Sequence, residues 1–572
     1  MTTRHRLYLI RAGFVALAFV KLFLITGQVR YAIGAAVHDD ALFVRLASHL
    51  AKGEWLGPYD SFTLIKGAGY PLWIAGNSFL PLPLYVAEHL FYMAACLVFV
   101  WAIRPIVPAA TALVLFGLLL FNPFTTGVAS LRFIRESIYP SQALLFAAFM
   151  SGLLARATTS FKSLEAWALG LGLAWGFLWI TREEGVWIVP ALVVAYLVLC
   201  VRFWQSQIRM RRRIAVLTLP LIVWGGCLMA VSIQNYRYYG LFATNELKRQ
   251  EFVAAYGTIA RVRHAEWRQY VPVPRETMRR IFQVSPTFQR LQPVLDGDRG
   301  QMWGRIGRRS QGLGRAYAGE IPGGWFIWAF REAVQRTGHY SSPQAAMQFY
   351  ESVATEVQEA IDAGRLSVDS SAVSLAPPWR KEYFVPLIGA IVQGADFLVG
   401  FEDYSPEGPP SAPPLELMQE MSGDRLVREE QPSGRMSLDG YKLAILSGVG
   451  AIYQAVMPIV SGLCLTAYLL MVIVPRFRRR GAFVAVNAAL LSALFARLTL
   501  LGYIDVSSFR VINTNYLSPL YPLLLAFCGL VAADVMHAWR GDHGPDAQLE
   551  LVSSIVPPER TQSSPIRYHS RE

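Results

Sequence analysis

The feature that most constrains the fold is a set of ten apolar segments, each long enough to cross a lipid bilayer. They cover residues 7–27, 84–103, 107–126, 138–156, 164–181, 186–201, 214–235, 447–474, 481–502 and 515–538. At about 1.5 Å of rise per residue, helices of this length match a hydrocarbon core of about 30 Å. We therefore predict an all-α integral membrane protein with about ten transmembrane helices.

The amino-acid composition indicates the same class of protein. Hydrophobic residues make up 53% of the 572 residues and charged residues only 16%, whereas soluble domains carry about a quarter charged residues. The net charge of +13 could suggest binding to nucleic acid. However, the arginines cluster in short loops between the apolar segments, where the positive-inside rule places them. The excess of basic residues thus reflects membrane topology and does not indicate a nucleic-acid partner.

The positions of the basic residues predict which loops face the cytoplasm. The basic leader from Met1 to Arg6 places the N-terminus inside, and the first span lacks an A-x-A cleavage site, so it is retained. If successive spans cross the membrane in alternate directions, the loops with the following basic residues face the cytoplasm: Arg104, Arg156 with Lys162, Arg202 to Arg213, and Arg476 to Arg480. We expect a multi-pass protein of a bacterial plasma membrane with both termini in the cytoplasm.

The chain divides into four parts. Residues 1–236 form a seven-span module with a first outer loop at 28–83, and 237–440 form an extracytoplasmic, mainly helical domain. Residues 441–539 form a three-span module, and 540–572 a disordered cytoplasmic tail. Residues 384–401 are apolar and nearly long enough to span, but crossing there would put Arg476 to Arg480 outside. We expect an interfacial or re-entrant helix at this point.

Two helices are predicted in the extracytoplasmic domain, over residues 323–366. The sequence Ser341-Ser342-Pro343 separates them, and Gly364 is a suitable C-terminal stop. Trp325, Trp328 and Tyr350 could stack on sugars, but their helical spacing favours ordinary core packing.

Two adjacent acids, Asp39 and Asp40, begin a short amphipathic run in the first outer loop. Apolar residues recur there at three- and four-residue spacing, and the run is too short to span, so we expect an interfacial helix. A single Asp would suffice to cap such a helix, whereas adjacent carboxyl groups titrate as a coupled pair. We favour a catalytic role for Asp39 and Asp40 over capping, with His38 as a further site candidate.

Lys66 and Tyr70 lie at the far end of the same loop, beside glycines. A lysine binds phosphate as a point charge, and glycine allows close approach of the backbone. The alternative is a lysine that extends its ammonium group to the interface beside a turn. Together with the acids, Lys66 and Tyr70 are predicted to form a site for an anionic, lipid-borne substrate.

Further charged clusters emerge on the same outer face. Two are in tight turns and one is in the last outer loop: Arg132, Arg135 and Glu136; Arg182, Glu183 and Glu184; Arg510 and Tyr516. Arginines on the outer side run against the topological bias, so Arg135 and Arg182 are predicted to bind phosphate. The acids of these turns, with Arg510 and Tyr516, are further candidates. Solvated turns and interfacial anchors remain open as alternatives.

The first outer loop resembles that of the polytopic C-type glycosyltransferases, the GT-C superfamily. This superfamily includes protein mannosyltransferases, aminoarabinose transferases and oligosaccharyltransferases. Asp39-Asp40-Ala41-Leu42-Phe43 is similar to its acidic-acidic-Ala-x-Phe motif, with Asp39 in the catalytic position. Lys66-Gly67-Ala68-Gly69-Tyr70-Pro71 is similar to the Lys-Gly-Pro-Gly-Tyr-Pro turn of mannosyltransferase-like members. The resemblance covers residues 1–240 with some specificity, and the rest in architecture alone.

The resemblance implies transfer of a sugar from a polyprenyl-phosphate donor to a lipid, glycan or protein acceptor, with inversion at the anomeric carbon. Asp39 would then be the general base, while cations stabilise the leaving phosphate. No cofactor is expected, and no metal site is predicted because all five cysteines lie in apolar segments without metal-ligand spacing; a divalent cation near Asp40 stays open. The competing hypotheses are a transporter, which would show inverted repeats and mid-membrane polar groups, and a non-catalytic scaffold that binds envelope glycans.

Overall fold

The structure is a computed structural model that describes residues 3–157, 161–205, 209–370, 372–428, 437–475 and 481–539. Within these ranges the chain is almost entirely helical, with three isolated β-bridges and no strand of a sheet. Ten of the described helices are long and apolar enough to cross a membrane. The predicted all-α, multi-pass membrane architecture is confirmed. The predicted tail at 540–572 and the basic loop from Arg476 to Arg480 lie outside the described residues.

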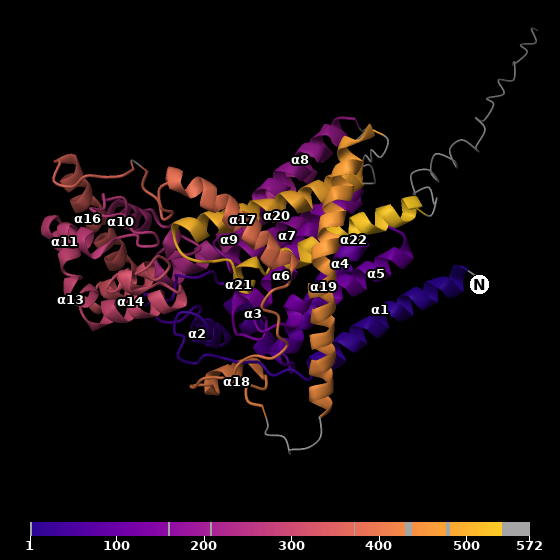
Figure 1. Cartoon of the computed structure of the whole chain (residues 1–572), viewed down its shortest axis with the longest axis horizontal. Coiled ribbons are helices and arrows are strands. Elements are labelled where there is room, and N and C mark those ends of the chain that lie inside the picture. The colour runs from indigo at the N-terminus through magenta and orange to yellow at the C-terminus, as the bar shows by residue number, and fades with distance from the viewer. Residues whose placement is uncertain are drawn as a thin grey trace, which may run out of the picture.

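The apolar helices form one bundle with a shared hydrophobic core (Figure 1). They are α1 (Thr3–Ile25), α4 (Leu84–Ala102), α5 (Ala109–Leu120), α6 (Tyr139–Ala155), α7 (Phe161–Thr181), α8 (Val189–Trp204), α9 (Met210–Tyr239), α17 (Phe384–Val399), α19 (Leu438–Ile473), α20 (Ala482–Ser507) and α22 (Leu520–Trp539). The side chains of α9 and α19 stay largely exposed, as expected for helices that face lipid.

Nine of the ten predicted spans coincide with helices of spanning length. The exception is the predicted span 107–126, where α5 covers only 12 residues. It ends before Pro123, which lacks a backbone donor and begins the 3₁₀ turn η1 (Pro123–Thr126), so the prediction of a full-length helix is wrong here. The tenth helix of spanning length is instead the one that contains α17.

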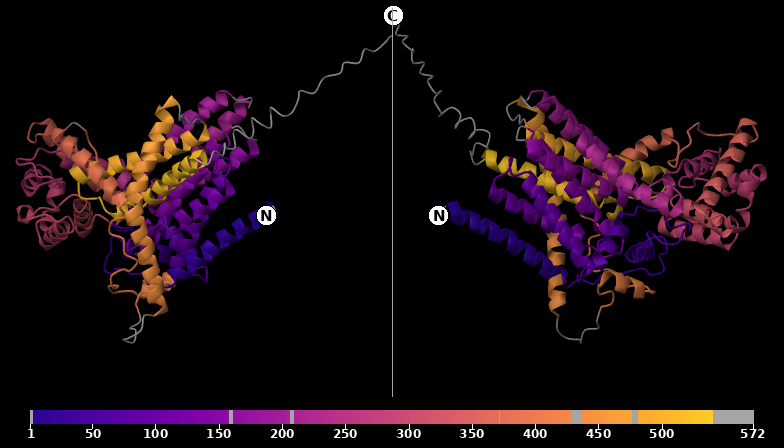
Figure 2. Two further views of the ribbon diagram at one scale, coloured as in Figure 1. Left: turned by 45° about the vertical axis from the view of Figure 1, so that its right-hand side comes forward. Right: turned by 180° about the vertical axis from the view of Figure 1, so that it is seen from behind.

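A helical head domain, residues 241–380, covers one end of the bundle, and the ends of α1 and α22 that carry the termini lie away from it (Figures 1 and 2). Its helices are α10 (Gln250–Ala260), α11 (Arg275–Val284), α12 (Pro286–Gln289), α13 (Gln292–Leu295), α14 (Asp298–Ser310), α15 (Phe326–Arg336) and α16 (Pro343–Asp362), with the turns η4 (Glu246–Lys248) and η5 (Arg315–Tyr317). Ser342 caps α16 through its side chain and Gly364 has a φ of 73°, so the two helices predicted at 323–366 are confirmed.

Helix α17 enters and leaves the bundle on the same side. At its start, Tyr503 near the C-terminal end of α20 donates a hydrogen bond to the Pro377 carbonyl. After its end, Phe401 packs on Tyr521 at the start of α22, and Tyr404 lies 3.2 Å from the Thr126 hydroxyl. The end of α20 and the start of α22 are joined by a short connection containing α21 (Thr514–Leu517), so the two ends of α17 lie against elements at the same side of the bundle. This geometry favours an interfacial or re-entrant helix.

The first loop lies between the bundle and the head. It contains α2 (Asp40–Ala51) and α3 (Gly69–Ser78), and η6 (Lys381–Tyr383) and α18 (Glu416–Ser422) complete the connections on this side. Leu42, Leu46 and Leu64 of the loop share one core with the head helices, so burial of apolar surface joins the two parts. The division of the chain into four domains stays a prediction.

Candidate active site

The two acids of the first loop point in different directions. Asp39 precedes α2 as its N-cap residue, but its side chain makes no capping hydrogen bond. Asp40 is the first residue of the helix and is fully buried, whereas the Asp39 side chain is 32% exposed. The capping interpretation therefore does not account for the Asp39 carboxylate, which stays partly exposed.

Asp40 is held by Arg132 from the turn between α5 and α6. Its Oδ2 accepts hydrogen bonds from the Arg132 side chain at 2.6 and 2.9 Å, and its Oδ1 lies 3.4 Å from the Ile33 amide. A parallel β-bridge between Tyr31 and Arg132 brings these segments together. Burial raises the pKa of the Asp40 carboxyl group although Arg132 opposes this effect. Asp40 is thus a structural anchor for Arg132.

Asp39 forms an ion pair with Lys66 from the other end of the loop. Arg132 lies 3.7 Å from Asp39 Oδ2, and His38 Nε2 lies 3.9 Å from the same oxygen. Burial alone would raise the pKa of Asp39, but the neighbouring charges, with Lys66 contributing most, lower it to about 2. Asp39 is therefore an ionised carboxylate at neutral pH.

Aromatic rings from the head lie around His38 and Lys66, the neighbours of this carboxylate. The His38 ring centre lies 5.5 to 6.1 Å from those of Trp328, Trp325 and Trp303. Lys66 Nζ lies 5.7 Å from the centre of the Trp328 ring, on its face. Beside His38 an open groove of about 420 Å³ is lined by Val37, Phe62, Arg299, Trp303, Glu332, Gln335 and Arg336. The groove thus reaches Val37, two residues before Asp39, and its walls combine apolar and polar side chains.

A second group of charges adjoins Lys66 through its neighbour Gly67. The Gly67 amide donates a hydrogen bond to Glu183 Oε1 at 2.7 Å, and Glu183 Oε2 accepts one from Arg135 at 2.6 Å. Cβ atoms added at Gly67 and Gly69 would meet the end of α7, 2.1 Å from the Ile180 carbonyl oxygen and 2.2 Å from the Thr181 hydroxyl oxygen. Glycine is therefore required for this approach.

The remaining predicted charges form a network behind Glu183. Arg182 is 1% exposed and pairs with Glu136 at 2.8 Å and with Glu184 at 3.2 Å. Glu184 also accepts a hydrogen bond from Arg497 of α20 at 3.0 Å, and the Tyr516 ring lies 5.0 Å from the Arg182 guanidinium. Despite burial, the pKa of Glu184 is lowered to about 2, with Arg182 contributing most. Arg182 could hold a phosphate directly only if this network opened.

Two predicted residues lie outside these clusters. Tyr70 is fully buried, and its hydroxyl donates a hydrogen bond to Glu88 of α4 at 3.0 Å. Arg510 is exposed at the junction with the head, where its amide donates to Gln311 at 2.6 Å. None of their recorded contacts among the described residues is with Asp39 or Lys66. Their proposed roles in substrate binding stay predictions.

Several residues of the site were not among the sequence-based candidates. Arg132 had the same signal as Arg135, an arginine in an outer turn, but only the fold pairs it with both acids. Arg497 lies within an apolar helix, and this position alone could have marked it, because ionisable residues in spans are rare. Tyr350 is buried in the head core as expected, whereas Trp325 and Trp328 are half-buried beside His38.

Among the described residues, no group of three or more His, Cys, Asp and Glu side chains could hold a metal ion. A divalent cation bound by Asp40 would have to displace the Arg132 guanidinium from a fully buried carboxylate.

Comparisons with known proteins give structural matches only. No family model matches this chain, and no curated protein matches it. Solved structures similar to it include ArnT from Cupriavidus metallidurans in the apo state, with 16% identity over 95% of this chain and 80% of that chain, at a TM-score of 0.32. The same ArnT bound to undecaprenyl phosphate matches with 14% identity over 98% and 82% of the chains, at a TM-score of 0.28.

An oligosaccharyltransferase from Archaeoglobus fulgidus, in the apo form, matches with 12% identity over 99% of this chain and 62% of that chain, at a TM-score of 0.31. The TM-scores of these matches are low, so the function is inferred from the side chains of the site.

Proposed function

We propose that this protein is a membrane glycosyltransferase that moves a sugar from a polyprenyl-phosphate donor to an acceptor hydroxyl group. The observation that carries the proposal is the ion pair of Asp39 and Lys66, a partly exposed base beside a phosphate-binding cation. The reaction takes place on the extracytoplasmic face of a bacterial plasma membrane, as the arginine distribution predicts. The acceptor is a lipid, a glycan or a protein.

The transfer is a single displacement. The acceptor oxygen bonds to the anomeric carbon while the bond from that carbon to the phosphate oxygen breaks, so the configuration inverts. The acceptor proton passes to Asp39, and the polyprenyl phosphate leaves with one additional negative charge. A positioned general base contributes typically about 10²–10⁴ in rate, and cations beside the leaving group stabilise the developing charge.

Donor binding would also activate the base. Lys66 neutralises Asp39 in the free protein and keeps the pKa of Asp39 low, which makes this carboxylate a weak base. A phosphate that accepts hydrogen bonds from Lys66 would compete with Asp39 for the same charge. The pKa of Asp39 would then rise, so its proton affinity increases only when donor is present. We expect donor to bind before the acceptor is deprotonated.

Two further cations are available to the donor phosphate. Arg135 is 12% exposed and pairs with Glu183, which also contacts the Lys66–Gly67 backbone. Lys248 of the head is exposed, and no carboxylate of the described residues lies within ion-pair distance of it. Its ammonium group lies 5.3 Å from the centre of the Trp179 ring, at the end of α7. In this proposal Arg182 does not contact the phosphate, and it holds Glu136 and Glu184 in place through its ion pairs.

The proposal is tested by binding of undecaprenyl phosphate to the purified protein in nanodiscs, measured by native mass spectrometry. We expect binding to the wild type and at least a roughly tenfold weaker affinity for Lys66→Ala, since a charge-assisted hydrogen bond contributes about 1.5–3 kcal/mol. Lys52→Ala is the matched control, because Lys52 is exposed at the end of α2. Equal affinity of the wild type and Lys66→Ala, or no binding at all, would exclude this donor site and leave a transporter or a scaffold.

A further inference from the structure

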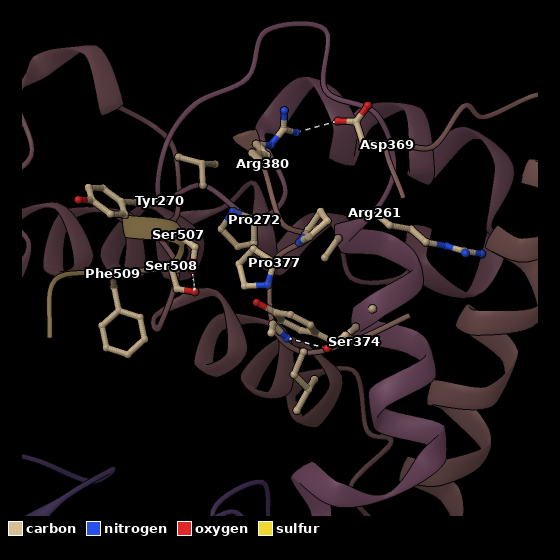
Figure 3. A pocket seen from close by; sticks show the side chains of 18 of the residues that line it. Arg261, Tyr270, Pro272, Asp369, Ser374, Pro377, Arg380, Ser507, Ser508 and Phe509 are labelled. Carbon is tan, nitrogen blue, oxygen red and sulfur yellow. Dashed lines mark hydrogen bonds and ion pairs between the residues drawn. The ribbon is translucent and has the colours of Figure 1, made fainter. Parts of the chain in front are cut away.

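A second cavity lies at the junction of the head with the bundle, separate from the groove beside His38. It has a volume of about 130 Å³. Its walls come from the segment after α10, the start of α15, the segment before α17 and the residues after α20 (Figure 3). Four segments far apart in the chain therefore meet around one partly open cavity where the head joins the bundle.

The lining combines aromatic rings with a few polar groups. Trp267, Tyr270, Tyr383 and Phe509 supply rings, while Ser374, Ser507 and Ser508 supply hydroxyl groups (Figure 3). Binding sites for small molecules share this character, with mostly apolar walls and a small number of placed polar groups. A saccharide ring has the matching surface, because its C–H face can lie on an aromatic ring while its edge carries hydroxyl groups.

The charged residues of the lining already have polar partners, and Arg261 donates a hydrogen bond to the Gln358 side chain. Arg380 forms an ion pair with Asp369 at 2.9 Å, and Arg268 lies 3.4 Å from Glu320. An anionic ligand would have to separate these pairs, which costs free energy when the partners are partly buried. The cavity is therefore suited to a neutral ligand.

One acceptor group in the lining lacks a partner. His264 Nε2 lies 3.2 Å from the Pro272 carbonyl, so this nitrogen carries the proton, and burial lowers the pKa of the ring. His264 Nδ1 is buried and has no hydrogen-bond partner among the described residues. An unsatisfied buried acceptor costs about 1–3 kcal/mol, so a ligand hydroxyl would gain a hydrogen bond to Nδ1 if the His264 ring turned toward the cavity.

The backbone beside the cavity is strained. Tyr270 has a φ of 65°, in the left-handed region that residues with a side chain seldom adopt. Its carbonyl accepts a hydrogen bond from the Gly323 amide at 2.6 Å, which holds the loop against the start of α15. Such strain persists where surrounding contacts impose it, and it concentrates at binding sites.

One short segment separates this cavity from the candidate active site. Gly323, Gly324 and Ile327 line the cavity. Trp325 and Trp328, which alternate with them along the chain, lie against His38 next to Asp39. A ligand that occupies both this cavity and the space beside His38 would extend past a single turn of α15.

We propose that this cavity binds one neutral saccharide ring of the acceptor, remote from the hydroxyl group that reacts. The assignment of the ring to the acceptor rests on the glycosyltransferase function proposed above. Binding of a saccharide in the cavity does not require catalysis, so it is tested separately from transfer.

The test is saturation-transfer difference NMR of the full-length protein in nanodiscs, with N-acetylglucosamine, methyl α-mannoside and α-1,6-mannobiose as probes. We expect at least one probe to bind with a Kd that is roughly millimolar, as is typical of a ligand of this size. Ser508→Trp, which fills the cavity, should weaken binding at least tenfold. Ser352→Trp, on the exposed face of α16, is the matched control and should bind normally.

Two further measurements keep the outcomes distinct. Binding of undecaprenyl phosphate to Ser508→Trp shows that the variant is folded, and Lys52→Ala should bind the saccharide normally because Lys52 is exposed at the end of α2, outside the cavity. If no probe binds to the wild type, or if Ser508→Trp binds as well as Ser352→Trp, the cavity proposal is wrong. Saccharide binding without any binding of undecaprenyl phosphate would retain the cavity and reject the donor site instead.

Discussion

Asp39 and Lys66, which are 27 residues apart in the chain, form a direct ion pair at the boundary between the bundle and the head. The next residue, Gly67, donates its amide to Glu183, so a single stretch of backbone contacts both charged clusters. The carboxylate proposed as the base and the ammonium group proposed to bind phosphate are thus held by the same loop.

Removing the carboxylate of Asp39 should abolish most of the transfer activity without loss of the fold. Asp39→Asn is expected to reduce kcat at least roughly a hundredfold, since a positioned general base contributes about 10²–10⁴. Undecaprenyl phosphate should still bind. The same change at Asp40 should act mainly on stability, because Asp40 is buried against Arg132. Near-normal turnover of Asp39→Asn would refute the mechanism. An inactive but stable Asp40→Asn would show that Asp40 is the base and Asp39 the supporting residue.

Removing the charge of Lys66 should shift the pH dependence of the reaction. The pKa of Asp39 is depressed to about 2, so the wild type should show no acid limb from this group above about pH 4. In Lys66→Met the burial remains and the main stabilising charge is lost, so the pKa should rise by roughly 1–3 units. The profile of kcat/KM against pH, which reports the free enzyme, should then fall as the pH is lowered through roughly 5 to 3. An unchanged pH profile would show that Lys66 does not control the pKa of Asp39.

Removing the partner of the buried acid should destabilise the protein. Arg132→Ala leaves the Asp40 carboxylate buried and unpaired, and loss of one member of a buried pair costs about 3–5 kcal/mol. The control is Arg45→Ala, since Arg45 is 39% exposed in its pair with Asp60, where about 0–1 kcal/mol is expected. Thermal unfolding in detergent measures both. Equal Tm values for the two variants would contradict the structural role of Arg132.

A methyl group at Gly67 should displace the loop from α7. The added carbon would lie 2.1 Å from the Ile180 carbonyl oxygen, and backbone atoms there cannot move aside cheaply. We expect Gly67→Ala to weaken binding of undecaprenyl phosphate and to lower Tm, because both Lys66 and the Glu183 contact shift. Gly76→Ala, in α3, meets no atom within 4 Å and should behave as wild type. Similar binding by the two variants would show that the close approach is dispensable.

The two ends of α17 should be accessible from the same side of the membrane. Glu382 and Glu407 are exposed before and after this helix. Cysteines at both positions should react with a membrane-impermeant maleimide added to intact cells that have a permeabilised outer envelope. If Glu407→Cys reacts only after the plasma membrane is opened, α17 crosses the bilayer and the predicted topology is wrong.

The sequence alone determined the features that depend on neighbouring residues. Apolar runs identified nine of the ten spanning helices, because transfer of a segment into lipid depends on its own composition. The acid pair before α2 and the Pro343 and Gly364 boundaries of α16 were predicted for the same reason, since motifs and caps act within a few residues.

Only the tertiary structure decided which charged groups meet. Arg132 reaches Asp40 across 92 residues, and Glu183 reaches Gly67 across 116. Solvent exposure differs between residues that look alike in the sequence. Asp39 and Arg135 are partly exposed, whereas Asp40 and Arg182 are buried. The head brings Trp325 and Trp328 to His38. Charge partners and solvent exposure set the chemistry of a carboxylate, and both arise from contacts between segments that have no fixed spacing in the chain.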